Sequence, residues 1–242
     1  AGIGSRAILN FYYPGSLPQD LGGPVVVRVW FYDAPAFHVR SAPAYPDGAD
    51  VTVAGGAILV DGQAVGTSLV LDGPVCLRKC YRGSVVATLR SAASTSMHVR
   101  NVVPLEEYLR SVVASEMPTS WPRAALRAQA IAARTYALAS LRADRDWDVY
   151  QDTRSQAYWG MEQETPRGDD AVASTAGRIR AFDATPILAM YSAGNGGWTH
   201  AVDGYPYLVR RRDLFDLAGA ALTARQPHLL GTHEAETPLP VG

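Results

Sequence analysis

The chain has 242 residues, of which 48% are hydrophobic and 19% charged, and its formal net charge is −1. This composition is that of a globular protein with enough material for one large domain or two small ones. The near-neutral charge argues against nucleic-acid binding by bulk electrostatics. No apolar run reaches about 18 residues, which argues against a membrane-spanning helix.

The N-terminal segment, residues 1–23, contains a short apolar stretch at residues 7–13 that the turn-forming pair Pro14-Gly15 closes. The chain begins with Ala1 rather than an initiator methionine, and it shows no signal-peptide pattern. We therefore expect a processed or trimmed chain.

Residues 24–100 predict a β-rich subdomain, because valine, isoleucine, threonine and glycine dominate them. Short apolar runs recur at residues 25–30, 57–60 and 84–89. Asp61-Gly62 and Asp72-Gly73 are dipeptides typical of hairpin turns.

Cys76 and Cys80 are the two cysteines of the chain. In one extended strand they would lie about 13 Å apart at roughly 3.3 Å per residue, too far for a disulfide. This geometry favours free thiols, and a local disulfide would require a turn at residues 77–79. No second Cys or His pair stands at zinc-ligand spacing, so a zinc site is not expected.

Two helices are predicted from residue 104 onward. Apolar residues recur at helical spacing behind Pro104, which suits a first helical turn: Leu105, Tyr108, Leu109, Val112 and Val113. A second helix is expected over residues 122–141, with Ser120 as its cap and Pro122 in its first turn. Alanine occurs on all sides of this second helix, which indicates a central, closely packed position.

Glu116 lies at the junction of these helices, and a breaker follows it at once. A carboxylate at a helix C-terminus faces the negative end of the helix dipole, which disfavours ionisation and raises its pKa. A carboxyl group that stays protonated near neutral pH can act as a general acid. The alternative is a solvated glutamate at a helix end.

Three polar residues, Gln129, Arg134 and Thr135, interrupt the alanine-rich helix. A buried arginine must be paired, so a structural hydrogen-bond network is the favoured interpretation. The alternative is that Gln129 or Arg134 orients Glu116 or a sugar.

The remaining part of the chain mixes short elements. Residues 142–166 are loop-like with strand fragments at 148–150 and 155–160, and a short helix is expected at residues 169–175. Two strands, residues 178–182 and 186–192, are joined by a turn at 183–185. The tail beyond residue 216 shows no periodicity. We divide the chain into residues 1–23, 24–100, a catalytic core at 101–213 and a C-terminal tail at 214–242.

Three sequence blocks resemble the stage II sporulation protein D family, which includes the amidase-enhancer (LytB-type) proteins. The first is residues 102–137, with Ser115-Glu116-Met117-Pro118 at its centre. The second comprises Asp152-Thr153, Gln156, Tyr158 and Gly160, and the third comprises residues 189–193, 196–199 and 206–208. Residues 8–16 match a further short family segment, which in many relatives follows a Gly/His-rich stretch absent here. The chain is therefore expected to be truncated at its N-terminus.

We expect an α+β fold, with a helical catalytic core around the long alanine-rich helix and a β-rich subdomain in the N-terminal half. The resemblance implies lytic transglycosylase chemistry on peptidoglycan glycan strands, with Glu116 as the catalytic acid and a preference for strands stripped of their peptides. No cofactor is expected. Some family members bind zinc beside the second block, but this chain has Tyr150, Arg154 and Ser155 there, so no metal is expected.

The predicted substrate-binding residues are Gln129, Arg134, Gln156, Tyr158, Ser192, Asn195, Gly196, Gly197 and Trp198. The glycine loop at residues 194–197 alternatively forms only a tight turn. Trp121, Trp159, Tyr158 and Trp198 are candidate stacking faces for sugars, although such rings more often belong to a core. Asp152 is the best second carboxylate, or else a turn residue, and His200 is interpreted as a surface residue.

Two other functions stay open. The chain could be a non-catalytic amidase enhancer that binds glycan or an amidase, or a structural sugar-binding module. In each case the expected partners are glycan strands and a candidate cell-wall amidase. The expected location is outside the cytoplasm, in the cell envelope or secreted.

Overall fold

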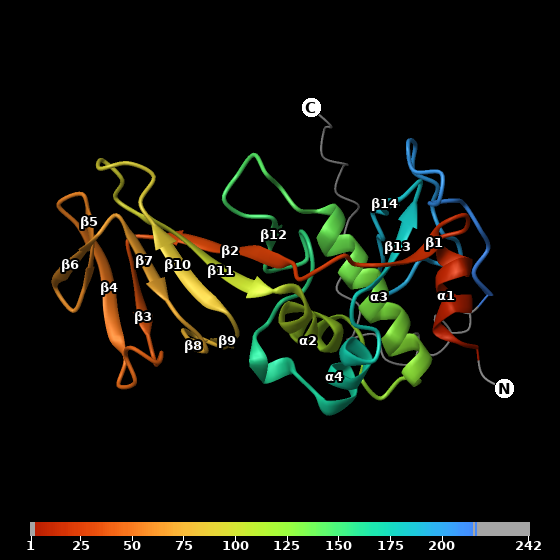
Figure 1. Ribbon diagram of the computed structural model, residues 1–242, viewed down its shortest axis with the longest axis horizontal. Coiled ribbons are helices and arrows are strands. Elements are labelled where there is room, and N and C mark those ends of the chain that lie inside the picture. The colour runs from red at the N-terminus through yellow and green to blue at the C-terminus, as the bar shows by residue number, and fades with distance from the viewer. Residues whose placement is uncertain (1–2, 215, 217–242) are drawn as a thin grey trace. The chain divides into compact units, whose positions relative to one another are not determined.

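A computed structural model describes residues 3–214 and residue 216 (Figure 1). The chain divides into two compact units, residues 1–191 and residues 192–242. The mixture of helices and antiparallel sheets confirms the α+β class. The boundaries predicted at residues 23, 100 and 213 stay predictions, and most of the predicted C-terminal tail lies outside the described residues.

A five-stranded sheet forms the framework of the first unit. Alternate residues of its strands, such as Val27, Val29 and Phe31, point into the core, because successive side chains of a strand face opposite sides. One edge strand runs parallel to its neighbour and the other pairings are antiparallel. The strand order is β12 (Val149–Tyr150), β2 (Val26–Ala34), β11 (Met97–Pro104), β10 (Ser84–Thr88) and β7 (Ser68–Leu71).

A four-stranded meander continues the β-rich half, which the composition predicted. Asp61 and Gly62 both have positive φ and connect its last two strands, as the dipeptide indicated. Asp72-Gly73 does not close a hairpin, because the strand before it pairs with β10 instead. The meander comprises β3 (Ala36–Val39), β4 (Ala49–Ala54), β5 (Ala57–Val60) and β6 (Gln63–Gly66).

Cys76 and Cys80 form a disulfide, so the expectation of free thiols was wrong. The chain turns back between β8 (Val75–Cys76) and β9 (Cys80–Tyr81), where the Leu77 amide donates to the Lys79 carbonyl at 2.9 Å. This turn brings the two Cα atoms to 3.9 Å, whereas an extended strand would have separated them.

The helices follow the β-rich half. Strand β11 runs directly into α2 (Leu105–Glu116), and α3 (Arg123–Ala139) is the alanine-rich helix. α1 (Ser5–Tyr12), α2, α4 (Pro166–Ala173) and β13 (Arg178–Phe182) all pack against α3, and its small side chains allow this close approach. Ser120 does not cap α3: the residue before the helix is Pro122, and no side chain caps it.

A small three-stranded sheet has the strand order β1 (Leu17–Asp20), β13 and β14 (Thr185–Pro186). Positive φ angles at Asp183 and Ala184 form the turn that the sequence predicted there, although the paired segment after it stops at Pro186. A short 3-10 helix, η1 (Met161–Gln163), precedes α4. In the described part of the second unit, Trp198 and Arg212 form an isolated antiparallel bridge. No helix among the described residues is both long and apolar enough to cross a membrane.

An ion pair between the buried Arg134 and the partly exposed Glu106 joins α3 to α2. Arg134 Nε and Nη2 donate to the two carboxylate oxygens of Glu106 at 2.8 and 2.7 Å. Arg134 is 0% exposed and also donates to the carbonyl of Arg178, the first residue of β13. These contacts support the structural interpretation of the polar residues in the alanine-rich helix, because a buried guanidinium requires such partners.

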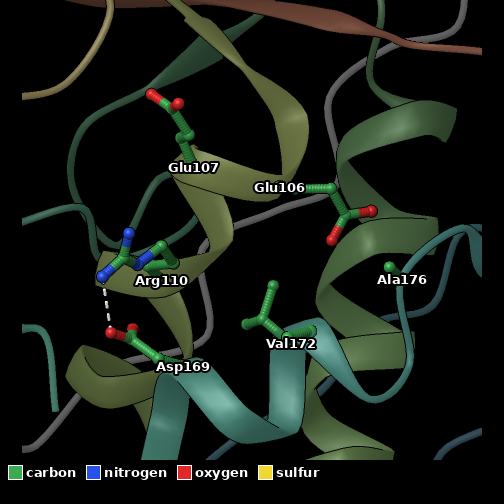
Figure 2. A pocket seen from close by; sticks show the side chains of 7 residues that line it. Glu106, Glu107, Arg110, Asp169, Val172 and Ala176 are labelled. Carbon is green, nitrogen blue, oxygen red and sulfur yellow. Dashed lines mark hydrogen bonds and ion pairs between the residues drawn. The ribbon is translucent and has the colours of Figure 1, made fainter. Parts of the chain in front are cut away.

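We predict that Glu106→Gln destabilises the protein by about 2 to 3 kcal/mol, because it leaves the cation of Arg134 buried without a counter-charge. This is less than the roughly 3 to 5 kcal/mol that breaking a fully buried pair costs, since the Glu106 side chain is 40% exposed. Glu107→Gln is the matched control, because its side chain points away from Glu106 (Figure 2). Urea denaturation measures both variants, and equal stabilities would contradict the assignment.

Candidate active site

Glu116 is the last residue of α2, at the junction that the sequence predicted. Its side chain is half-buried. Its Oε1 accepts a hydrogen bond from the backbone N–H of Ala157 at 2.6 Å, and the carboxylate is also hydrogen-bonded to the Tyr191 side chain. Two segments far from Glu116 in the sequence therefore fix the orientation of this carboxylate.

Gln156 determines which way the Tyr191 hydroxyl points. The Gln156 side-chain amide donates to the Tyr191 oxygen at 2.8 Å and to the Ala133 carbonyl at 3.2 Å. Its own carbonyl oxygen accepts from the Tyr108 hydroxyl at 3.1 Å. Since the Tyr191 oxygen already accepts one hydrogen bond, its proton is directed to Glu116. Gln156 is fully buried, so it acts on the carboxylate through Tyr191.

Burial is the largest influence on Glu116 and raises its pKa above the usual value. The hydrogen bonds from Ala157 and Tyr191 stabilise the ionised form and partly oppose this effect. The raised pKa agrees with the direction that the sequence predicted, but desolvation leads the causes rather than the helix dipole. A carboxyl group whose pKa is raised in this way is suited to donate a proton near neutral pH.

Tyrosines surround the carboxyl group of Glu116. The pKa values of Tyr191 and Tyr136 are raised, first by burial and also by the negative charge of Glu116. The pKa of Tyr108 is raised for the same reasons. These phenols therefore stay neutral across the physiological range and offer hydroxyl groups without adding charge. Sequence reasoning did not single out Tyr191 or Tyr136, because no local pattern marks a tyrosine that meets a distant glutamate.

The four predicted binding residues of the first unit are all buried: Gln129, Arg134, Gln156 and Tyr158. The Tyr158 hydroxyl donates to Asn101 Oδ1 at 2.9 Å, and its ring packs with Tyr108 and Tyr81. The hydrogen-bond partners of these side chains are other residues of the protein, so the side chains help to position the residues around Glu116. Direct contact of any of them with a sugar stays a prediction.

Asp152 forms an ion pair with Arg154, whose Nη2 lies 2.8 Å from Oδ2. The Arg154 side chain lowers the pKa of Asp152, and the Arg154 backbone N–H also donates to it. These are the contacts of a turn-forming aspartate, and they favour that interpretation over a second catalytic acid. Among the described residues, no three His, Cys, Asp or Glu side chains gather as a metal site would require.

The five other predicted binding residues, Ser192 to Trp198, lie in the second unit. Gly196 and Gly197 have positive φ, and the Gly197 amide donates to Asn195 Oδ1 at 2.9 Å. Asn195 also donates to Asp213 at 2.9 Å, and the Ser192 hydroxyl donates to the Gly194 carbonyl. These hydrogen bonds hold the loop in a defined turn. It leaves Trp198 43% exposed, and His200 is exposed as expected.

Two of the hollows on the described surface of the first unit are lined by charged residues, and Glu116 lines neither of these two. One, of about 320 Å³, is acidic (Figure 2). There Arg110 pairs with Asp169 at 2.6 Å, beside Glu106 and Glu107. The other, of about 260 Å³, is lined by Arg123, Pro166, Arg167 and Asp170.

We predict that Tyr191→Phe raises the pKa of Glu116 further, because it removes a hydrogen bond that stabilises the carboxylate. A carbon-13 NMR titration of the Glu116 carboxyl measures this pKa directly. Tyr45→Phe, in the β-rich half, serves as the control. An unchanged or lowered pKa in Tyr191→Phe would refute the proposed role of the hydroxyl.

We predict that Glu116→Gln becomes stabilising relative to wild type as pH rises. A folded-state pKa above the unfolded value means that the native carboxyl retains its proton longer. Its contribution to stability is present at low pH and is lost as pH rises through the folded pKa. The amide does not ionise, so thermal unfolding should show the two proteins converging at acidic pH. The opposite trend would show that the folded-state pKa is not raised.

Comparison with known proteins places the similarity on the helical part of the first unit. Residues 93–182 match the family model described as Stage II sporulation protein. The chain is 37% identical over 128 residues to stage II sporulation protein D of Bacillus subtilis (strain 168), covering 44% of this chain and 37% of that protein. It is 34% identical over 136 residues to stage II sporulation protein D of Bacillus amyloliquefaciens, covering 47% of this chain and 40% of that protein.

A third relative carries a different name. The chain is 33% identical over 113 residues to the amidase enhancer of Bacillus subtilis (strain 168), covering 45% of this chain and 15% of that protein. The chain thus spans less than half the length of each of these relatives. The segment matched by the family model contains Glu116, Arg134 and Gln156, and it ends before Tyr191.

Proposed function

Because the chain belongs, through residues 93–182, to the stage II sporulation protein D family, we propose that it is a peptidoglycan lytic transglycosylase. Its substrate is the bond between N-acetylmuramic acid and N-acetylglucosamine in peptide-stripped glycan strands. The observation that carries this proposal is the half-buried Glu116 carboxyl, oriented by Ala157 and Tyr191 and raised in pKa.

In the proposed mechanism Glu116 first acts as a general acid. It gives its proton to the glycosidic oxygen as the bond from C1 of muramic acid to that oxygen breaks. Glu116 is then a carboxylate, and it removes the proton from the 6-hydroxyl of the same muramic acid as that oxygen attacks C1. The products are a 1,6-anhydro-muramyl end and a free 4-hydroxyl on N-acetylglucosamine. Glu116 regains its proton, and no water is consumed.

One carboxyl group is sufficient for this sequence of steps, whereas hydrolysis of a glycosidic bond normally uses two flanking carboxylates. The raised pKa supports the acid role, because desolvation keeps the proton on Glu116 until the leaving oxygen takes it. The hydrogen bonds from Ala157 and Tyr191 support the base role, because they stabilise the carboxylate between the two proton transfers. Gln156 positions Tyr191 for this purpose.

The cellular setting follows from the same proposal. A glycan-strand lyase acts outside the cytoplasm, in cell-wall remodelling or sporulation. Its action on peptide-stripped strands makes a cell-wall amidase the natural partner, since an amidase produces those strands. The similarity to an amidase enhancer supports this partnership.

The second candidate function is a non-catalytic amidase enhancer. The similarity to the Bacillus subtilis amidase enhancer favours it.

We predict that the wild-type protein produces anhydro-muramyl ends from amidase-treated glycan strands, detected by mass spectrometry. Glu116→Gln should lower the rate by at least about 100-fold, because it removes the proton donor while preserving shape. Glu107→Gln, a carboxylate on the same helix, is the control and should retain activity.

Two outcomes would overturn the enzymatic proposal. Equal product from wild type and Glu116→Gln would remove Glu116 from the chemistry. No product from wild type alone, together with faster peptide release when an amidase is added, would identify an enhancer.

A further inference from the structure

The 260 Å³ hollow beside the loop that follows Glu116 is positively charged. Arg123 and Arg167 line it, and Arg127 lies one turn along α3 from Arg123, on the same face of the helix. All three arginines act on one carboxylate, Asp170, and help to lower its pKa. The lining itself has two guanidinium groups and one carboxylate, so it carries one positive charge in excess, and Arg127 adds to the positive potential nearby.

An exposed tryptophan precedes Arg123 by two residues. Trp121 is 48% exposed and lies in the loop between Glu116 and α3. Arg167 holds this loop, because its Nε donates to the Thr119 carbonyl at 2.6 Å and its Nη2 donates to the Trp121 carbonyl at 2.7 Å. The backbone of this loop is thus hydrogen-bonded to α4 through Arg167, and the Trp121 side chain is left exposed.

The two hollows differ in charge, so they favour ligands of opposite charge. The acidic hollow of Figure 2 has three carboxylates, from Glu106, Glu107 and Asp169, and one lining arginine. An anionic polymer is therefore repelled there and attracted to the hollow at Arg123. A guanidinium group binds a carboxylate well, and a tryptophan face stacks on the apolar face of a sugar ring.

We propose that Trp121 and Arg123 form a glycan subsite that recognises the free lactyl carboxylate of N-acetylmuramic acid. This inference rests on the proposed function and adds the residues that select its substrate. In a peptide-bearing strand the lactyl group is an amide and carries no charge at that position. Removal of the peptide exposes the carboxylate, which Arg123 binds while Trp121 stacks on the sugar.

Chain connectivity links this subsite to the catalytic carboxyl. Trp121 follows Glu116 by five positions, so the two Cα atoms lie within about 18 Å even for a fully extended chain. The loop contains a turn, with the Trp121 amide donating to the Pro118 carbonyl, and this shortens the distance. One glycan strand can therefore contact both residues, and the lactyl carboxylate at Arg123 would belong to a sugar near the scissile bond.

The test measures binding and needs no catalysis. The full chain carrying Glu116→Gln is titrated calorimetrically with a muramyl oligosaccharide bearing free lactyl carboxylates. The same oligosaccharide with its carboxylates converted to methylamides is the second ligand, and a chitin oligosaccharide is the third. We expect the free carboxylate form to bind roughly five- to tenfold more tightly than the other two.

Further substitutions in the Glu116→Gln chain separate the contribution of the arginine charge to binding from that of the tryptophan ring. Arg123→Gln should remove most of the preference for the free carboxylate and leave affinity for the methylamide unchanged; its side chain is 64% exposed, so the fold is preserved. Trp121→Ala should weaken all three ligands together. Asp170→Asn should tighten binding of the carboxylate form by about twofold, because Asp170 otherwise occupies Arg123 at 2.6 Å.

Arg78→Gln, an exposed charge in the turn between the two cysteines, is the matched control and should bind like the parent. Equal affinity for the charged and methylamide ligands, or Arg123→Gln indistinguishable from Arg78→Gln, would overturn the subsite. If this binding pattern holds while wild type forms no anhydro ends, the subsite stands and the enzymatic proposal fails. If product forms without the binding pattern, the enzyme stands and the subsite fails.

Discussion

The pairing of Arg134 with Glu106 is the contact on which the helical part of the first unit depends. A guanidinium with no exposed surface requires a counter-charge, and Glu106 supplies both carboxylate oxygens. Arg134 also binds the carbonyl of Arg178, the first residue of β13, so this side chain joins α2, α3 and the small sheet at one point. Glu116 lies on the same helix as Glu106, so the position of the candidate acid follows from this ion pair.

Glu116 is placed between two opposing influences, and neither dominates completely. Burial favours the protonated carboxyl, whereas the Ala157 amide and the Tyr191 hydroxyl favour the carboxylate. A group that must give up and recover a proton in one reaction cycle benefits from this balance. The tyrosines around it contribute hydrogen bonds without contributing charge, so they do not tie the pKa of Glu116 to a second titrating group.

Charge is unevenly distributed over the surface near the helices. The hollow formed by α2 and α4 is acidic, and the one at the start of α3 and α4 is basic. α4 contributes to both, through Asp169 to the first and Arg167 to the second. If glycan strands with free carboxylates are the substrate, this separation steers them toward the loop after Glu116. The β-rich half lies largely outside the matched family segment, which begins at residue 93.

The sequence by itself determined the two helices, the junction that holds Glu116 and the β-rich character of residues 24–100, because proline positions, helical periodicity and β-branched runs act locally. It also indicated that Arg134 would be paired, since buried charge is costly wherever it occurs. Only the tertiary structure decided that Glu106 is the partner, that Tyr191 and Ala157 bind Glu116, and that Cys76 meets Cys80. The first three contacts join residues 28, 75 and 41 positions apart, and the disulfide depends on a turn that local spacing did not reveal. Burial of the Glu116 carboxyl, the leading cause of its raised pKa, likewise exists only once those segments have packed together.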